Sequence, residues 1–138
     1  MESSKYRLKH KNLPSAWLAP ETMFLRQYSH KSDVWSFAIV LWEVYSLGDI
    51  PYRGMTHDEI EIEVRNLKLL EKPPDCPGAV FNLMLSSWNL SCKDRPTFRQ
   101  LRNCLALVVN DLSKEYNGHR TSYLATDQPL YFTLSQSS

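Results

Sequence analysis

The sequence predicts a mainly α-helical domain in which four helices are joined by loops. Three observations support this fold class: apolar residues recur at helical spacing, turn-forming glycines and prolines separate the periodic segments, and no segment has a strong strand pattern. With 138 residues, 43% of them hydrophobic, the chain is long enough for one domain with a packed core, plus tails.

The first predicted helix covers residues 32–47 and is apolar around nearly its whole circumference ("SDVWSFAIVLWEVYSL"). This pattern indicates a central helix that is buried on all sides. Ser32 is expected to cap its N-terminus, and Gly48 is expected to end it. Its longest apolar run is far shorter than the roughly 20 residues of a membrane-spanning helix, so the chain is predicted to contain no membrane segment.

Three more helices are predicted after the loop "GDIPYRGM". In "THDEIEIEVRN", alternating apolar residues are typical of a strand, but Thr56 and Glu59 form a capping box, so we expect a short amphipathic helix. The next helix runs from Val80 to Trp88. The last is capped by Thr97 and carries a helical stripe made of Phe98, Leu101, Cys104, Leu105, Val108 and Leu112.

Charge and composition exclude several classes of function. The net charge is +1, and the one basic stretch, residues 5–11, has no accompanying recognition motif, so nucleic acid is not an expected partner. Three cysteines (Cys76, Cys92 and Cys104) without a C-x-x-C pair predict free or buried thiols in a reducing, cytoplasmic compartment. The four histidines are widely scattered, and we expect no metal site.

Glu21 stands in the apolar stretch "WLAPETM". A carboxylate in such surroundings is costly to bury unless a cation or several donors meet it. The sequence therefore predicts a positively charged partner elsewhere in the chain.

Four segments in this order, "LPSAWLAPETM", "SHKSDVWSFAIVLWEVYSLGDIPYRGM", "CPGAVFNLMLSSW" and "DRPTFRQL", closely resemble the C-terminal lobe of a protein tyrosine kinase. The resemblance covers residues 6–112. It implies a protein-kinase-like lobe without the N-lobe and the catalytic loop. Residues 1–23 would be the end of the activation segment with the substrate platform, residues 24–112 the helical lobe, and residues 113–138 a mobile polar tail.

The resemblance also implies roles for single residues. Leu13, Pro14 and Trp17 match the substrate platform on which the peptide around a target tyrosine rests, although packing of a loop on the helix below is an equally simple explanation. Glu21 matches the acid of the A-P-E motif, whose partner in kinases is the arginine of the late R-P motif, here Arg95. Because a guanidinium can bind both carboxylate oxygens, this pair is expected to be a structural clamp and not a catalytic pair.

Two further positions carry an implied role and a simpler alternative. Asp33 matches the acid that anchors the catalytic loop, or it stabilises a helix N-terminus. Tyr6 matches an activation-loop tyrosine, or it is an unmodified surface residue. In the tail, Tyr123 and Tyr131 are candidate phosphosites, and Leu134 follows Tyr131 at a spacing that suits a phosphotyrosine-reading domain. The simpler alternative, a mobile tail with incidental tyrosines, is the favoured one.

The motifs of phosphoryl transfer do not occur in the sequence: there is no G-x-G-x-x-G, V-A-I-K, H-R-D or D-F-G. We therefore expect no catalytic or cofactor-binding residues in this chain and no phosphotransfer by it alone. ATP and Mg²⁺ are implied only for a longer parent protein. The chain is expected to begin after the catalytic machinery.

Two departures from the usual pattern favour an alternative function. Ser15 and Ala16 precede Trp17 where a basic residue is common, and Ala38 replaces a usual glycine. Both features resemble the integrin-linked kinase type of pseudokinase. The alternative is a non-catalytic interaction module that binds partners through the lobe surface or the tail.

The expected partners are protein substrates or signalling proteins. Self-association is expected for a separate reason: without the catalytic-loop side of its surroundings, the helix at residues 32–47 would leave apolar surface exposed. If the parent is a receptor, the location is the cytoplasmic face of a membrane.

Overall fold

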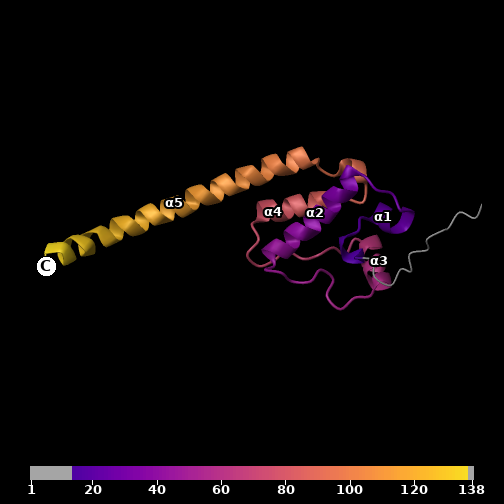
Figure 1. Ribbon diagram of the computed structural model, residues 1–138, viewed down its shortest axis with the longest axis horizontal. Coiled ribbons are helices and arrows are strands. Elements are labelled where there is room, and N and C mark those ends of the chain that lie inside the picture. Colours follow the sequence, from indigo (N-terminus) through magenta and orange to yellow (C-terminus); the bar gives the residue numbers. More distant parts are fainter. Residues whose placement is uncertain (1–13, 137–138) are drawn as a thin grey trace, which may run out of the picture. The chain divides into compact units, whose positions relative to one another are not determined.

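The computed structural model describes the backbone of residues 14–136 and the side chains of residues 14–119. Within these residues, five α-helices follow one another: α1 (Pro20–Leu25), α2 (His30–Tyr45), α3 (His57–Arg65), α4 (Gly78–Ser87) and α5 (Phe98–Gln136) (Figure 1). The described part also contains two short 3-10 helices, η2 (Ser15–Trp17) before α1 and η3 (Cys92–Asp94) before α5. Within residues 14–136 no strand is present, which confirms the mainly α-helical fold class.

The chain divides into two compact units, one up to Phe98 and one from Arg99 onward. The first unit contains α1 to α4 with both 3-10 helices, and α2 contacts η2, η3 and α4 within it. The predicted helices at 32–47, 56–66 and 80–88 correspond to α2, α3 and α4. α2 is therefore the central element of the first unit, as the sequence predicted.

The N-cap of α2 lies three residues before the predicted one. Ser29 is the N-cap, and its side chain accepts a hydrogen bond from the Ser32 backbone N–H, while the Ser32 hydroxyl accepts one from the Ser29 backbone N–H. The prediction of Ser32 as N-cap was wrong because either serine can cap a helix and the sequence does not decide between them. Gly48 follows the helix at φ +87°, a backbone conformation that favours glycine.

α2 buries one face only. Val34, Trp35, Ala38, Ile39 and Trp42 lie in the core. On the opposite face Phe37, Val40 and Val44 are 36%, 46% and 64% exposed. The Phe98 ring meets Phe37 edge-to-face on this side, with 5.9 Å between the ring centroids, but Val40 and Val44 stay exposed. The prediction that this helix is buried on all sides was therefore wrong for this chain.

α3 shows why the capping box outweighs the alternating pattern of its sequence. Thr56 accepts a hydrogen bond from the Glu59 backbone N–H, and the Glu59 carboxylate accepts one from the Thr56 backbone N–H. Ile60 and Val64 are four residues apart and both are buried, whereas Ile62 is exposed. This confirms the helix.

α1 was not among the predicted helices. It has only six residues and begins with Pro20 at a position that suits proline. Its last residue, Leu25, is followed by the C-cap Arg26 in the left-handed conformation with φ 54°. A helix this short has no measurable apolar period, so a sequence pattern cannot reveal it.

α5 begins directly after Thr97 and continues to Gln136, well beyond Leu112, where its predicted apolar stripe ends. The described side chains from Asp111 to His119 are all exposed. The mobility expected of residues 113–138 is a dynamic property and stays a prediction.

Candidate functional site

A buried ion pair joins the two ends of the first unit. The Arg95 guanidinium donates to both oxygens of Glu21, with Nη1–Oε1 and Nη2–Oε2 distances of 2.7 and 2.8 Å. The Arg95 side chain is 0% exposed and that of Glu21 is 13% exposed. The structure thus brings together the two residues that the sequence analysis paired, in the bidentate geometry that a guanidinium and a carboxylate prefer.

Further hydrogen bonds satisfy the remaining groups of this pair. Arg95 Nε donates to the Asn89 carbonyl at 2.8 Å, and Nη1 also donates to the Lys31 carbonyl at 2.9 Å. The Ser32 hydroxyl donates to Glu21 Oε1 at 2.9 Å. Buried charges are tolerated when they are paired and hydrogen-bonded in this way, so the site has the properties of a structural link.

The local fold explains the position of each partner. Glu21 lies in the first turn of α1, where the helix dipole favours a negative charge. Arg95 ends η3, and its guanidinium carbon lies 5.1 Å from the ring centroid of Trp35 on α2. The Lys31 ammonium group also donates to the Arg95 carbonyl. α1, α2 and η3 therefore meet at one polar cluster.

Burial alone would raise the pKa of the Glu21 carboxyl group. The hydrogen bonds from Arg95, from the Glu21 backbone N–H and from Ser32 outweigh that effect, together with the Arg95 charge, and the net pKa lies below the ordinary value of 4.5. Glu21 is consequently ionised at neutral pH. At that pH it has no proton to donate, and Arg95 occupies both of its oxygens, so the geometry favours a structural role over general acid or base chemistry.

The residues of the expected substrate platform lie at the start of the described chain. Pro14 is exposed and precedes η2, and Trp17 is the half-buried last residue of η2. The Trp17 indole N–H donates to Glu43 Oε1 of α2 at 2.5 Å, and the Ser36 hydroxyl donates to the Trp17 carbonyl at 2.6 Å. Leu13 lies outside the described residues.

Glu43 was not among the residues singled out from the sequence as site candidates. The available signal was a carboxylate within an otherwise apolar helix, the same signal that drew attention to Glu21. Its partner Trp17 is 26 positions away, and no local pattern predicts such a contact.

The other predicted site residues do not join this cluster. Asp33 is exposed in the first turn of α2, where the helix dipole favours its charge. Tyr6 lies outside the described residues. Tyr123 and Tyr131 fall on the backbone of α5, and their side chains are outside the described part.

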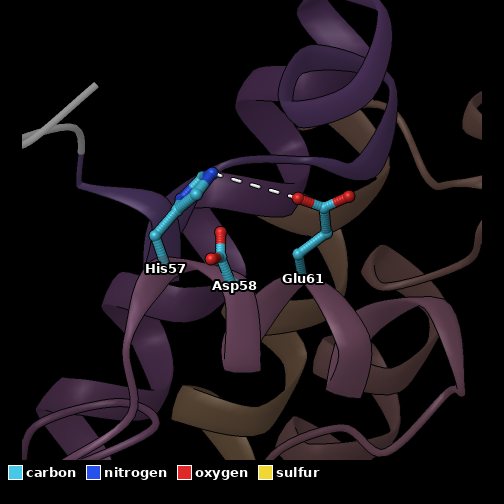
Figure 2. Close-up of side chains that lie close together, drawn as sticks. All are labelled: His57, Asp58 and Glu61. Atoms are coloured by element: carbon cyan, nitrogen blue, oxygen red, sulfur yellow. Dashed lines mark ion pairs between the residues drawn. The ribbon is translucent and has the colours of Figure 1, made fainter. Parts of the chain in front are cut away.

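A second cluster, not predicted from the sequence, lies at the start of α3. Ligand atoms of His57, Asp58 and Glu61 are all within 4.8 Å of one another, and Figure 2 shows the three side chains projecting from neighbouring turns. His57 Nε2 lies 4.0 Å from Glu61 Oε2, while Arg65 donates to Glu61 Oε1 at 2.9 Å. The i, i+4 spacing of His57 and Glu61 was the signal for this contact.

This α3 cluster has the character of a charged helix surface. Asp58 is exposed, the side chains of His57 and Glu61 are 31% and 30% exposed, and Arg65 already neutralises the Glu61 carboxylate. A bound divalent cation would compete with that guanidinium and with water. The cluster offers one imidazole and two carboxylates, and His57 Nδ1 is buried without a hydrogen-bond partner. The exposure of Asp58 and the Arg65–Glu61 ion pair nevertheless make a charged helix surface the simpler description.

All three cysteines are free thiols, as predicted: Cys76 is buried, Cys92 is half-buried and Cys104 is exposed. Burial raises the pKa of the Cys76 thiol, which makes it a poor nucleophile at neutral pH. Among the described helices, none combines the length and the hydropathy that a bilayer span requires.

The Glu21–Arg95 pair, which the resemblance to kinases led us to expect, is accompanied by sequence similarity to kinases over most of the chain. A model of the family described as protein tyrosine and serine/threonine kinase matches residues 1–105. The tyrosine-protein kinase transmembrane receptor Ror of Drosophila melanogaster is 40% identical over 104 residues, which are 75% of this chain and 15% of the relative. The activated Cdc42 kinase Ack of Drosophila melanogaster is 36% identical over 115 residues, 83% of this chain and 11% of the relative.

A third relative, the tyrosine-protein kinase Fer of Mus musculus, is 40% identical over 98 residues, 71% of this chain and 12% of the relative. The chain thus spans only a small part of the length of each of these relatives. The match to the family model nevertheless covers most of the chain and includes Glu21, Arg95 and Trp17. The chain therefore belongs to the family of protein tyrosine and serine/threonine kinases.

Proposed function

We propose that this chain is the substrate-side lobe of a protein tyrosine kinase domain, which as a complete domain transfers the γ-phosphate of ATP to protein tyrosine. The observation that carries the proposal is the buried Glu21–Arg95 pair, which links the A-P-E segment to the R-P segment. The names of the relatives support tyrosine as the acceptor. In this proposal Glu21 and Arg95 hold the lobe together and take no part in the chemistry.

The proposal includes that this chain alone does not transfer phosphate. Phosphoryl transfer depends on positioning and on charge neutralisation by a lysine, by metal-binding carboxylates and by a catalytic-loop aspartate. The motifs that carry these groups do not occur in the 138 residues. ATP and Mg²⁺ would bind to the complete domain, with Asp33 anchoring the backbone of the catalytic loop.

The part of the reaction that this chain can serve is the binding of the protein substrate. Pro14 and Trp17 would support the peptide around the target tyrosine, together with Leu13. An exposed proline beside a half-buried indole offers an apolar surface with a fixed shape. This is the surface on which an extended peptide would rest.

Peptide binding tests this platform directly. A random copolymer of glutamate and tyrosine is passed over the immobilised chain, and its affinity is measured by surface plasmon resonance. We expect Trp17→Ala to weaken binding. Tyr28→Ala is the matched control, since Tyr28 is an aromatic residue of the same unit, is 77% exposed and lies outside the platform. Equal binding by the wild-type chain and Trp17→Ala would contradict the platform.

Phosphorylation and signalling contacts form the regulatory part of the proposal. Tyr6, Tyr123 and Tyr131 are the candidate phosphosites, and a phosphotyrosine-reading domain would bind at Tyr131, with Leu134 entering its apolar pocket. The setting would be the cytoplasm, or the cytoplasmic face of a membrane for a receptor. Mass spectrometry of the chain after incubation with an active tyrosine kinase tests these sites, and the absence of phosphate on all three would contradict their assignment.

A non-catalytic interaction module is the second candidate, and one observation favours it. Phe37, Val40 and Val44 form an exposed apolar stripe on α2, a surface that soluble proteins commonly use for contacts with other proteins or with a second copy. We call these three residues the α2 stripe. Protein binding that depends on the α2 stripe, combined with no copolymer binding at Trp17, would favour this candidate over the first.

A further inference from the structure

An open groove, which we call the α3 groove, lies between α3 and the loop that precedes it, with a volume of about 300 Å³. Its lining consists of Arg53, Gly54, Met55, Glu59, Ile62 and Glu63. Ile62 and Glu63 follow Glu59 by three and four residues, so these three side chains share one face of α3. Met55 and Ile62 are 42% and 54% exposed and give the groove apolar surface beside its two carboxylates.

Hydrogen bonds hold both sides of the α3 groove in place. On the helix side, the capping box joins Thr56 and Glu59. On the loop side, the Met55 backbone N–H donates to the carbonyl of the buried Tyr52 at 3.0 Å. A groove that is already formed loses little conformational freedom when a partner binds, which lowers the cost of binding.

The α3 groove favours a partner with positive charge. Arg53, the cation in its lining, is already bonded to Asp49, with an Nη2–Oδ1 distance of 2.5 Å. Glu63 lies 3.5 Å from the ammonium group of Lys68, but that side chain is 68% exposed, and such surface pairs are weak. α3 as a whole carries four carboxylates and one arginine. A complementary partner therefore combines cations with an apolar side chain.

Residues 5–11, "KYRLKHK", have this composition, although they lie outside the described part of the chain. The segment contains no carboxylate, and Leu8 stands between Arg7 and Lys9. The long stems of arginine and lysine can pack on apolar surface while their charged ends reach a carboxylate. The order of cation, leucine and cation thus complements a groove that has apolar side chains beside two carboxylates.

The segment is also close enough to reach the α3 groove. The described chain begins at Pro14, and η2, which follows directly, contacts α3. The six residues from Leu8 to Pro14 span up to about 20 Å. α3 has nine residues and is therefore roughly 14 Å long. The reach of the segment thus exceeds the length of the helix on which it would lie.

We propose that residues 5–11 dock in the α3 groove of the same chain. Leu8 contacts the two apolar residues of the groove, and the cations on either side of Leu8 bind the two groove carboxylates. A segment that is linked to its site has an effective concentration in the millimolar range, so a weak intrinsic affinity is sufficient. This inference goes beyond the proposed function and does not depend on phosphotransfer or on peptide binding at Trp17.

The first arm of the test locates position 8 in the full 138-residue chain. The photoreactive residue p-benzoylphenylalanine replaces Leu8, the chain is irradiated, and crosslinked peptides of the monomeric band are identified by mass spectrometry. We expect crosslinks to Met55 and Ile62. Their yield should fall severalfold when NaCl is raised from about 0.05 to about 0.5 M, because salt screens exposed ion pairs.

Met23 and the dimeric band are the internal controls. Met23 is a methionine of the same unit that does not line the α3 groove. Crosslinking to Met23 that equals or exceeds crosslinking to Met55 would overturn the inference. Crosslinks to Met55 that occur only in the dimeric band would show that the segment of a second copy occupies the groove, which would also overturn docking within one chain.

The second arm exchanges the charges of the two partners. Arg7→Glu with Lys9→Glu forms the segment variant, and Glu59→Gln with Glu63→Lys forms the groove variant. Glutamine at position 59 keeps the capping box. Each variant alone should reduce crosslinking to Met55 severalfold, and their combination should restore much of it.

Far-ultraviolet circular dichroism checks that both variants keep the helical content of the wild type. Unchanged crosslinking in the segment variant would overturn the inference. The same holds if the combined variant restores nothing while its helices are intact. If the groove variant loses helical signal, the segment variant decides alone, because its substitutions lie outside the helices.

Discussion

Arg95, whose side chain is fully buried, binds both carboxylate oxygens of Glu21 from 74 positions further along the chain. The pair joins α1 to the segment that leads into α5. Because each partner is desolvated and specifically bonded, the loss of one leaves the other as an uncompensated charge. The pair is therefore expected to be the most sensitive polar contact in the first unit.

Stability measurements test this expectation. Arg95→Met and Glu21→Leu should each lower the free energy of unfolding by about 3–5 kcal/mol, as for other broken buried ion pairs. The larger loss is expected for Glu21→Leu, because it leaves the more deeply buried of the two charges without its counter-ion. Urea unfolding followed by circular dichroism measures both values.

The double variant and a surface pair provide the controls. Glu21→Leu combined with Arg95→Met should cost clearly less than the sum of the single variants, since no unpaired charge remains. Breaking the exposed Arg53–Asp49 pair should change stability little. Additive losses in the double variant would contradict the clamp.

The free energy of unfolding should depend on pH through the titration of the Glu21 carboxyl group. Its pKa in the folded chain lies below the ordinary value of 4.5, so the unfolded chain takes up the proton first as pH falls. The stabilisation by Glu21 is thus fully present above that value and is lost as pH falls through the folded pKa. The unfolding free energies of the wild type and Glu21→Gln should converge on acidification, and parallel curves would count against this assignment.

The α2 stripe should cause association between chains. Val44 is 64% exposed and Val40 is 46% exposed, and burial of such surface in a contact is favourable by about 25 cal/mol per Å². We expect the apparent mass in sedimentation velocity to rise with concentration, and Val44→Lys to reduce that rise. Ile62→Lys is the matched control, because Ile62 is an exposed apolar residue on α3. A wild-type chain that stays monomeric at high concentration would refute the prediction.

The second half of α5 should exchange its amide hydrogens quickly. The described side chains from Asp111 to His119 are exposed, so tertiary packing does not support residues 111–119 of the helix. Pro129 lacks an N–H group, and proline inside a helix costs about 3 kcal/mol. Hydrogen exchange with mass spectrometry should show protection near Leu101 and little after residue 113, with a local gain in Pro129→Ala. Uniform protection up to Gln136 would contradict the mobile tail.

Regular helices could be predicted from local sequence patterns, but the elements that pack against each helix could not. The apolar period of residues 80–88 and the capping box at Thr56 correctly indicated α4 and α3. The all-apolar helix at residues 32–47 was identified as α2, yet its exposed stripe depends on which elements are present to cover it. The six-residue α1 is too short for any period.

Contacts between residues that are far apart in the sequence could not be predicted from local sequence patterns alone. The unusual acid at Glu21 indicated that a cation was needed, but only the resemblance to kinases pointed to Arg95. Glu43 gave the same signal and had no such guide, so its bond to Trp17 appeared only in the structure. Solvation arguments thus identify residues that need a partner, and the fold determines the partner.

The most direct test is a phosphotransfer assay with the purified 138-residue chain. The chain is incubated with γ-labelled ATP, Mg²⁺ and the glutamate–tyrosine copolymer, and a complete tyrosine kinase domain serves as the positive control. We predict copolymer binding that depends on Trp17 and no incorporation of phosphate into tyrosine. ATP-dependent tyrosine phosphorylation that copurifies with the homogeneous chain would contradict the account.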